Sequence, residues 1–151
     1  MDEGGGRLTM HGARCLLIRP ETLAALQKSV EALIASRASE CLAAGGRAGG
    51  ARAVAAAQED APARVARLLR TGGEIGWGDF ALERLTPSAL VVTVRNSPFA
   101  EAYGVADHPV CHLTRGVLEA LAASVLARPA PVVETACAAT GAPACRFETV
   151  A

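Results

Sequence analysis

The stretch VVETACAATGAPACRFET, residues 132–149, decides how the C-terminal part of this chain folds. Val132–Thr135 and Cys145–Thr149 are short segments of the kind that forms β-strands. Between them, Thr140–Pro143 contains a glycine and a proline, which favour a tight turn. We therefore predict a hairpin whose turn brings the facing ends of the two strands together.

Four residues in and before this hairpin form a candidate metal site: Cys111, Glu134, Cys137 and Cys145. Thiolates and a carboxylate are a sufficient donor set for four-coordinate zinc. A site closed by four protein ligands has no open position for substrate, so this zinc would be structural. Buried cysteines without a metal are the alternative, since free cysteine commonly behaves as a small hydrophobe. A Cys137–Cys145 disulfide is also open, although a reducing compartment argues against it.

Local geometry sets two conditions on this site. On one regular strand Glu134 and Cys137 would face opposite sides, so the chain must curl between them. His108 and His112 are competing ligands, and the sequence leaves open whether either contacts the metal. His112 lies about 100° around a helix from Cys111, so we expect it to point elsewhere.

Other residues are assigned by their distance from this site in the sequence. We expect Cys15 and Cys41 to be buried apolar residues, because both are far from the other three cysteines. Three thiolates and one carboxylate around zinc carry a net charge of about −2 and call for nearby hydrogen-bond donors. Arg115 and Arg146 are the candidates for this role, and solvent-exposed arginines are the alternative.

Upstream of the hairpin, apolar periodicity predicts mostly helices. One helix begins at Pro20, a second begins at Pro62 and stops at Gly72, and a third begins at Pro109. The alanine- and glycine-rich segment 42–57 is either a helix packed very closely on a neighbour or a flexible loop. Residues 14–18 resemble a short strand.

Two further strands are predicted on either side of a turn at Thr86–Ser88, the second being Leu90–Arg95. Helices come first, strands follow, one helix intervenes and strands close the chain. This order favours an α+β fold, with an antiparallel sheet packed against a helical layer. We expect one domain, residues 14–151, after a flexible N-terminal tail at residues 1–13 that contains three consecutive glycines.

Composition limits the classes of partner. The 151 residues carry 15 basic and 15 acidic side chains, so the formal charge is zero and nucleic-acid binding is not favoured. No apolar run approaches the roughly 20 residues that span a bilayer. Without a recognisable signal peptide, a cytoplasmic location is the default expectation.

Several motifs resemble the 4-vinyl-reductase-type domain family. They are Asn96–Phe99, His108–Leu113 with Gly116, and Val133–Cys137 through Gly141 to Cys145–Phe147, with weaker similarity at residues 14–20 and 43–50. The family includes the sensory modules of phenol- and xylene-responsive transcription activators and is related to TRAPP subunits. The resemblance implies a TRAPP-like ligand-binding fold, with zinc held by cysteines and a glutamate at positions that match the four residues above.

The resemblance also implies a small-molecule pocket between the helices and the sheet. Trp77, Phe80, Phe99 and Tyr103 are its candidate lining, and ordinary core packing explains these aromatic residues equally well. In the aromatic sensors a tryptophan and a histidine hold the phenol hydroxyl. Here Phe99 falls near the tryptophan and the histidine has no match, which favours an apolar ligand.

We find no phosphate-binding loop, dinucleotide fingerprint or nucleophile motif, so the sequence does not favour an enzyme. Our first hypothesis is a zinc-stabilised sensor or carrier of a hydrocarbon-like ligand. Its output would pass through a protein partner or through a homodimer formed by the face around residues 43–57. The alternatives are an accessory or catalytic protein of tetrapyrrole (bacteriochlorophyll) biosynthesis, nominally a 4-vinyl reductase, and a structural tether without a ligand.

Overall fold

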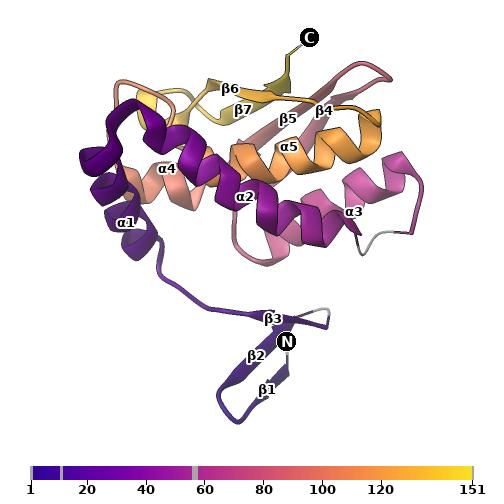
Figure 1. The fold of residues 1–151 in the computed structure, drawn as a ribbon, viewed down its shortest axis with the longest axis horizontal. Coiled ribbons are helices and arrows are strands. Elements are labelled where there is room, and N and C mark those ends of the chain that lie inside the picture. Colours follow the sequence, from indigo (N-terminus) through magenta and orange to yellow (C-terminus); the bar gives the residue numbers. More distant parts are fainter. Residues whose placement is uncertain (1, 11, 56–57, 151) are drawn as a thin grey trace.

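A four-stranded antiparallel sheet forms one side of the molecule in the computed structural model, which describes residues 2–10, 12–55 and 58–150 (Figure 1). The strands follow the spatial order β4-β5-β7-β6. Their bounds are Asp79–Leu85 for β4, Leu90–Arg95 for β5, Val132–Ala136 for β6 and Cys145–Thr149 for β7. The predicted C-terminal hairpin is therefore confirmed as β6 and β7, which pair directly.

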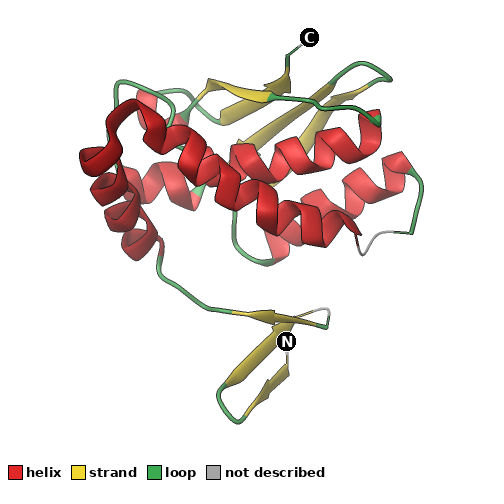
Figure 2. Cartoon of the chain, viewed as in Figure 1, coloured by secondary structure: helices red, strands yellow, loops and turns green. Residues whose placement is uncertain are grey.

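Helices form the other side, so the α+β fold class is confirmed (Figure 2). The α-helices are α1 (Pro20–Ile34), α2 (Ala38–Ala55), α3 (Ala61–Glu74), α4 (Pro98–Tyr103) and α5 (His112–Leu126), and the 3-10 turns are η1 (Ala35–Arg37) and η2 (Ala138–Thr140). Helix α5 packs against β6 and β7 and is covered in turn by α2. No described helix is long and apolar enough to cross a membrane.

The described N-terminal residues form a second, smaller antiparallel sheet of three strands: β1 (Asp2–Gly4), β2 (Arg7–Met10) and β3 (Ala13–Cys15). The glycine run that predicted a flexible tail lies at the turn between β1 and β2. The strand predicted at residues 14–18 extends only to Cys15, because β2 offers pairing partners no further. Leu16 and Leu17, which follow it, are 83% and 87% exposed.

The alanine- and glycine-rich segment is helical through Ala55, and residues 56–57 lie outside the described part of the chain. Its glycines allow α2 and α5 to touch along their backbones. A Cβ atom added at Gly46 would lie 2.2 Å from the carbonyl oxygen of Leu113, and one added at Gly116 would lie 2.0 Å from that of Ala43. The face around residues 43–57 is thus largely used within the chain, against α5.

Helix α5 begins at His112, so the prediction that it starts at Pro109 was wrong by three positions. Cys111 is its N-cap residue rather than part of its first turn. The physical reason is that the groups before the helix are bonded elsewhere. The Cys111 backbone N–H donates to Glu134 at 2.9 Å, and the Val110 carbonyl accepts from the Gln27 side chain at 3.0 Å.

Candidate metal centre

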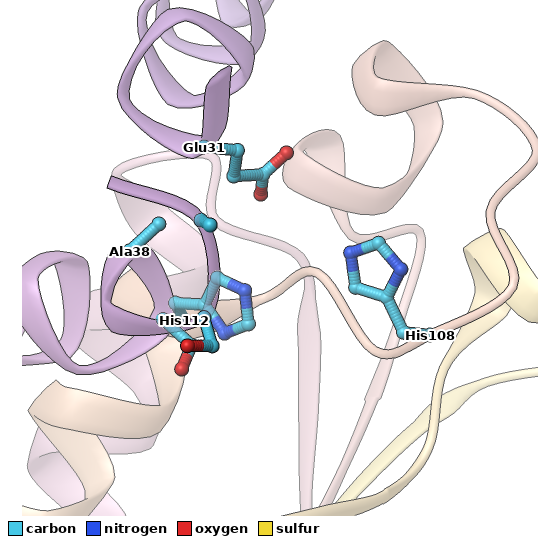
Figure 3. A pocket seen from close by; sticks show the side chains of 7 residues that line it. Glu31, Ala38, His108 and His112 are labelled. Atoms are coloured by element: carbon cyan, nitrogen blue, oxygen red, sulfur yellow. The ribbon is translucent and has the colours of Figure 1, made fainter. Parts of the chain in front are cut away.

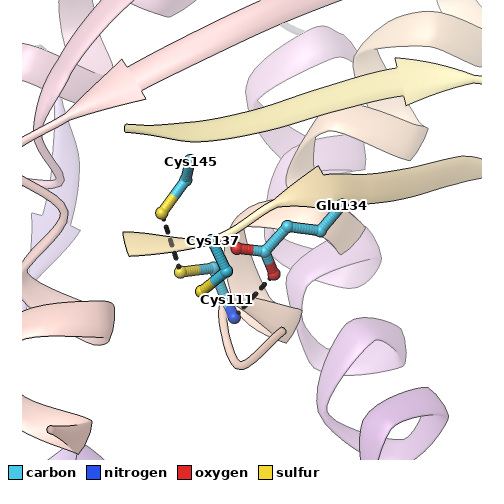
Figure 4. Close-up of side chains that lie close together, drawn as sticks. All are labelled: Cys111, Glu134, Cys137 and Cys145. Carbon is cyan, nitrogen blue, oxygen red and sulfur yellow. Dashed lines mark hydrogen bonds between the residues drawn. The ribbon is translucent and has the colours of Figure 1, made fainter. Parts of the chain in front are cut away.

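Four side chains from three parts of the fold meet in the core: Cys111, Glu134, Cys137 and Cys145 (Figure 4). Their ligand atoms all lie within 4.8 Å of one another. The three cysteines are at most 1% exposed and Glu134 is 6% exposed. The predicted set is therefore brought together in full, and it is able to hold a metal ion.

Each ligand sits where a regular element begins or ends, or next to an irregularity in it. Cys111 precedes α5, Glu134 lies within β6, Cys137 follows β6 directly, and Cys145 opens β7. The pairing of β6 with β7 shifts register between Glu134 and Ala136, which marks a β-bulge. This bulge is the predicted curl, and it lets Glu134 and Cys137 face the same point.

The turn between Cys137 and Cys145 is stabilised by its own backbone. The Cys137 carbonyl accepts hydrogen bonds from the N–H groups of Thr140 at 3.0 Å and Ala142 at 3.2 Å. Gly141 adopts a φ of 93°, a left-handed conformation that favours glycine. The chain is therefore reversed so that both thiols lie on the inner side of the turn.

The donor set fits a tetrahedral metal ion. The Sγ atoms of Cys111 and Cys145 are 3.6 Å apart. Two thiolates on one zinc ion, with Zn–S bonds of about 2.3 Å and a tetrahedral angle, lie about 3.8 Å apart. All five cysteines fall within the described residues and all are free, so the Cys137–Cys145 disulfide is not formed.

Glu134 carries a second sign of metal binding. Its Oε2 accepts the hydrogen bond from the Cys111 backbone, whereas Oε1 is buried and has no hydrogen-bond partner among the described residues. Leaving a buried carboxylate oxygen unpaired is costly, and coordination of a metal ion removes that cost. The orphaned atom therefore supports metal binding over simple burial.

The protonation of the four side chains leads to the same inference. Burial away from water raises the pKa of the Glu134 carboxyl to about 8. Hydrogen bonding to Cys137 and Cys145, with burial, also raises the pKa of the Cys111 thiol, while the Cys137 thiolate is stabilised and its pKa lowered. The group by itself thus holds back part of its negative charge with protons, which a divalent cation would displace.

The neighbours of the site are not the ones we expected. Arg115 bonds to Glu119 and Arg146 bonds to Glu83, and neither guanidinium is bonded to the four ligands. The donors near the sulfurs are instead short-range ones. Ser97 Oγ lies 3.5 Å from Cys111 Sγ, and the Ala138 backbone N–H donates to Cys145 Sγ at 3.3 Å.

Ser97 is the residue that sequence reasoning missed. It caps α4, where its Oγ accepts from the Ala100 N–H at 3.5 Å. The available signal was the pair Ser97-Pro98, which is typical of a helix start. That signal places the residue on a cap and gives no indication that the cap lies against Cys111.

The expectation that Cys15 and Cys41 are buried was also wrong. Cys41 is exposed and Cys15 is half-buried. The prediction for Cys41 extends the apolar periodicity of the first helix beyond its end. The turn η1 interrupts that helix, and α2 then starts with a new rotation, so the extrapolated apolar face no longer applies.

The two competing histidines line a separate pocket of about 340 Å³ with Glu31 (Figure 3). His112 and His108 do not belong to the metal-ligating group found in the described residues. Burial lowers the pKa of His112, so its imidazole stays neutral near pH 7. The ring of His108 lies beside Asp107, with Nδ1 and Oδ1 separated by 2.6 Å.

The four candidate pocket aromatics are divided between different surroundings. Trp77 and Phe99 meet edge to face with ring centroids 4.9 Å apart. Phe80 packs beside Gly72, and the Tyr103 hydroxyl donates to Glu31 at 2.6 Å. Phe99 also lines a cavity of about 160 Å³ between α1, α2 and α5.

The fold and the site together define a class of protein. It is an α+β domain with a buried group of three cysteines and one glutamate. Residues 90–151 match the family model of the 4-vinyl-reductase domain, which confirms the resemblance to that family. No curated protein matched the sequence.

Two solved structures share the fold. The phenol-responsive sensory domain of the transcription activator PoxR, solved with phenol, superposes with a TM-score of 0.84 at 18% identity, covering 95% of this chain and 80% of its own. A vinyl-4-reductase family protein from Methanocaldococcus jannaschii superposes with a TM-score of 0.59 at 16% identity, covering 85% of this chain and 76% of its own. At these identities the likeness establishes the fold.

Proposed function

We propose that this chain is a zinc-stabilised domain that binds an apolar small molecule and acts as a sensor or a carrier. The observation that carries the proposal is the shared fold. The chain matches a phenol-responsive sensory domain over 95% of its length with a TM-score of 0.84. Small-molecule sensing is the role that this likeness supports.

Zinc is proposed because of the donor set. Three thiolates with one carboxylate, closed on all sides by protein, are typical of a structural zinc site. The 3.6 Å sulfur separation and the unpaired oxygen of Glu134 support this choice. In this proposal the ion holds the start of α5, the end of β6 and the start of β7 together.

The aromatic group remains the proposed lining for the apolar ligand. Trp77, Phe80, Phe99 and Tyr103 all contribute to or pack against the hydrophobic core. The cavity beside Phe99 is otherwise lined mainly by aliphatic side chains of α1, α2 and α5. Binding there would depend on apolar area removed from water, at about 25 cal/mol per Å².

A homodimer is proposed as the route for output, together with a protein partner. Leu26 and Leu33 of α1 are 57% and 83% exposed, and Leu16 and Leu17 add further apolar surface before that helix. Exposed apolar side chains of this size favour association. Light scattering is expected to give twice the monomer mass, and a monomer at high micromolar concentration would refute the dimer.

Native mass spectrometry of freshly purified, reduced protein tests the proposed function directly. We expect one zinc ion for each chain and an additional mass from a retained or added apolar molecule. Protein that carries zinc but binds no molecule from a panel of phenols, acyl chains and polyprenols would support a structural tether instead. Protein without any metal would contradict the zinc assignment.

A further inference from the structure

A groove of about 740 Å³ runs between α2, α5 and the segment before β6, and continues onto the start of that strand. Most of its lining is aliphatic: Ala51, Val54, Ala55, Ala120, Ala123, Pro129, Ala130, Pro131, Val132 and Val133. None of the described residues that line it is aromatic. A flat aromatic ligand would find no stacking partner here, whereas an aliphatic chain would be covered along its length.

Charged side chains complete the lining and lie together at one end. Gly46 contacts α5 at Leu113 and Gly116, and Gly50 contacts it at Val117, so α2 and α5 run past each other in the same direction. Arg47 and Arg115 therefore come from the early part of this crossing. The valine and alanines farther along both helices come from its later part.

The two guanidiniums lie between an inner and an outer carboxylate. Glu119, whose side chain is 9% exposed, bonds to Arg47 and to Arg115, the latter at 2.9 Å, and lies 3.4 Å from the Val132 N–H. Glu40 also bonds to both guanidiniums, to Arg115 at 3.3 Å, but its side chain is 63% exposed. The group is electrically neutral, with two positive and two negative side chains.

The inner and outer carboxylates differ in how readily they can leave. Glu119 is buried and held by three donors, so its removal would strand two charges away from water. An exposed ion pair such as that of Glu40 contributes little to stability, because solvent screens the charges. Another singly charged carboxylate is therefore able to take the place of Glu40 without changing the charge of the group.

We propose that this groove binds an aliphatic carboxylate, with its chain along the apolar lining and its carboxylate on Arg47 and Arg115 in place of Glu40. The inference rests on the proposed small-molecule function and adds a site and a ligand class to it. Guanidiniums suit a carboxylate because their planar N–H groups match its two oxygens. A doubly charged phosphate would instead leave the group with an extra negative charge beside the buried Glu119.

Calorimetry with octanoate and octan-1-ol on the intact chain tests the proposal, because the two probes share a chain length and differ in charge. We expect octanoate to bind at least about tenfold more tightly, since hydrogen bonds to a charged group are stronger than those to a hydroxyl. Equal affinity, or tighter binding of the alcohol, would overturn this inference and leave the proposed small-molecule function standing. Failure of both probes to bind at millimolar concentration would count against both.

The variant Glu40→Gln supplies the decisive second arm. It removes the competing carboxylate from an exposed position, so folding should be unaffected and octanoate should bind about three- to fivefold more tightly. The affinity for octan-1-ol should stay the same. Arg95→Gln, which removes a charge paired with Asp79 on the distant edge of the sheet, is the matched control and should change neither affinity.

Arg47→Gln is expected to abolish the preference for octanoate over octan-1-ol. A variant that folds, as judged by its circular dichroism, and keeps the preference would contradict the proposed carboxylate position. Unchanged octanoate binding in Glu40→Gln would contradict it as well, whether or not the arginine variant folds.

Discussion

The contact between α2 and α5 makes a strong prediction about two glycines on the same helix. Gly46 and Gly49 both lie inside α2, where replacement by alanine should gain about 0.8 to 1.0 kcal/mol of helix propensity. A Cβ at Gly49 would have no heavy atom within 4 Å, whereas one at Gly46 would lie 2.2 Å from the Leu113 carbonyl oxygen. The difference between the two variants therefore isolates the steric cost of the helix contact.

That cost follows from the geometry. Bringing the Gly46 Cβ to an ordinary contact distance requires the helices to separate by about 1 Å, which forfeits a quarter to a half of the dispersion attraction across the gap. Overpacking of this kind typically costs about 1 to 3 kcal/mol, and a backbone carbonyl cannot rotate away as a side chain does. We expect Gly46→Ala to lose about 2 kcal/mol net and Gly49→Ala to gain slightly less than 1 kcal/mol.

Urea denaturation followed by the fluorescence of Trp77 measures both variants against the wild type. In thermal unfolding the two should differ by about 6 to 12 °C, at about 2 to 4 °C for each kcal/mol in a domain of this size. Equal stability of Gly46→Ala and Gly49→Ala would refute the close contact of α2 and α5.

Three further predictions address single side chains. Cys137→Ser should reduce the metal content from one ion per chain to near zero and lower the melting temperature, whereas the exposed Cys41→Ser should do neither; metal analysis of both variants checks this. Hydrogen bonding to Glu31, with burial, raises the pKa of Tyr103, the only tyrosine, to about 12. Its contribution to stability is therefore fully present below pH about 10 and is lost as the pH rises towards 12, and the tyrosinate absorbance of Glu31→Gln should appear at lower pH than that of the wild type. Asp60→Ala should cost about 1 kcal/mol in denaturant unfolding, because the Asp60 side chain accepts the Ala63 N–H at 3.0 Å at the start of α3, and Asp60→Ser should recover most of that loss.

Much of the fold and most of the site were predictable from local patterns. The hairpin followed from short apolar runs around a glycine-proline turn, and the bulge followed from the odd spacing of Glu134 and Cys137. The four ligands were found because cysteine and glutamate at these spacings have a chemical reason to meet. These features depend on residues close together in the sequence or on the donor chemistry itself.

The parts that failed depend on tertiary contacts. The start of α5 is delayed to His112 because the groups before it bond to Glu134 and Gln27, which no periodicity reveals. Arg115 was assigned to the metal site from helix spacing, yet two carboxylates, Glu40 and Glu119, hold it elsewhere. Glycine composition left α2 undecided, because only the partner helix determines whether the lost propensity is offset by packing.

The four-ligand cage also ties folding to the chemical surroundings of the protein. It joins parts of the chain from residue 111 to residue 145 that are otherwise connected only through packing and the pairing of strands. A metal ion bound there stabilises the folded chain in proportion to the logarithm of its free concentration. Each tenfold fall in free metal would therefore withdraw about 1.4 kcal/mol of stability. The population of folded sensor or carrier would follow the metal supply even when its own ligand is abundant.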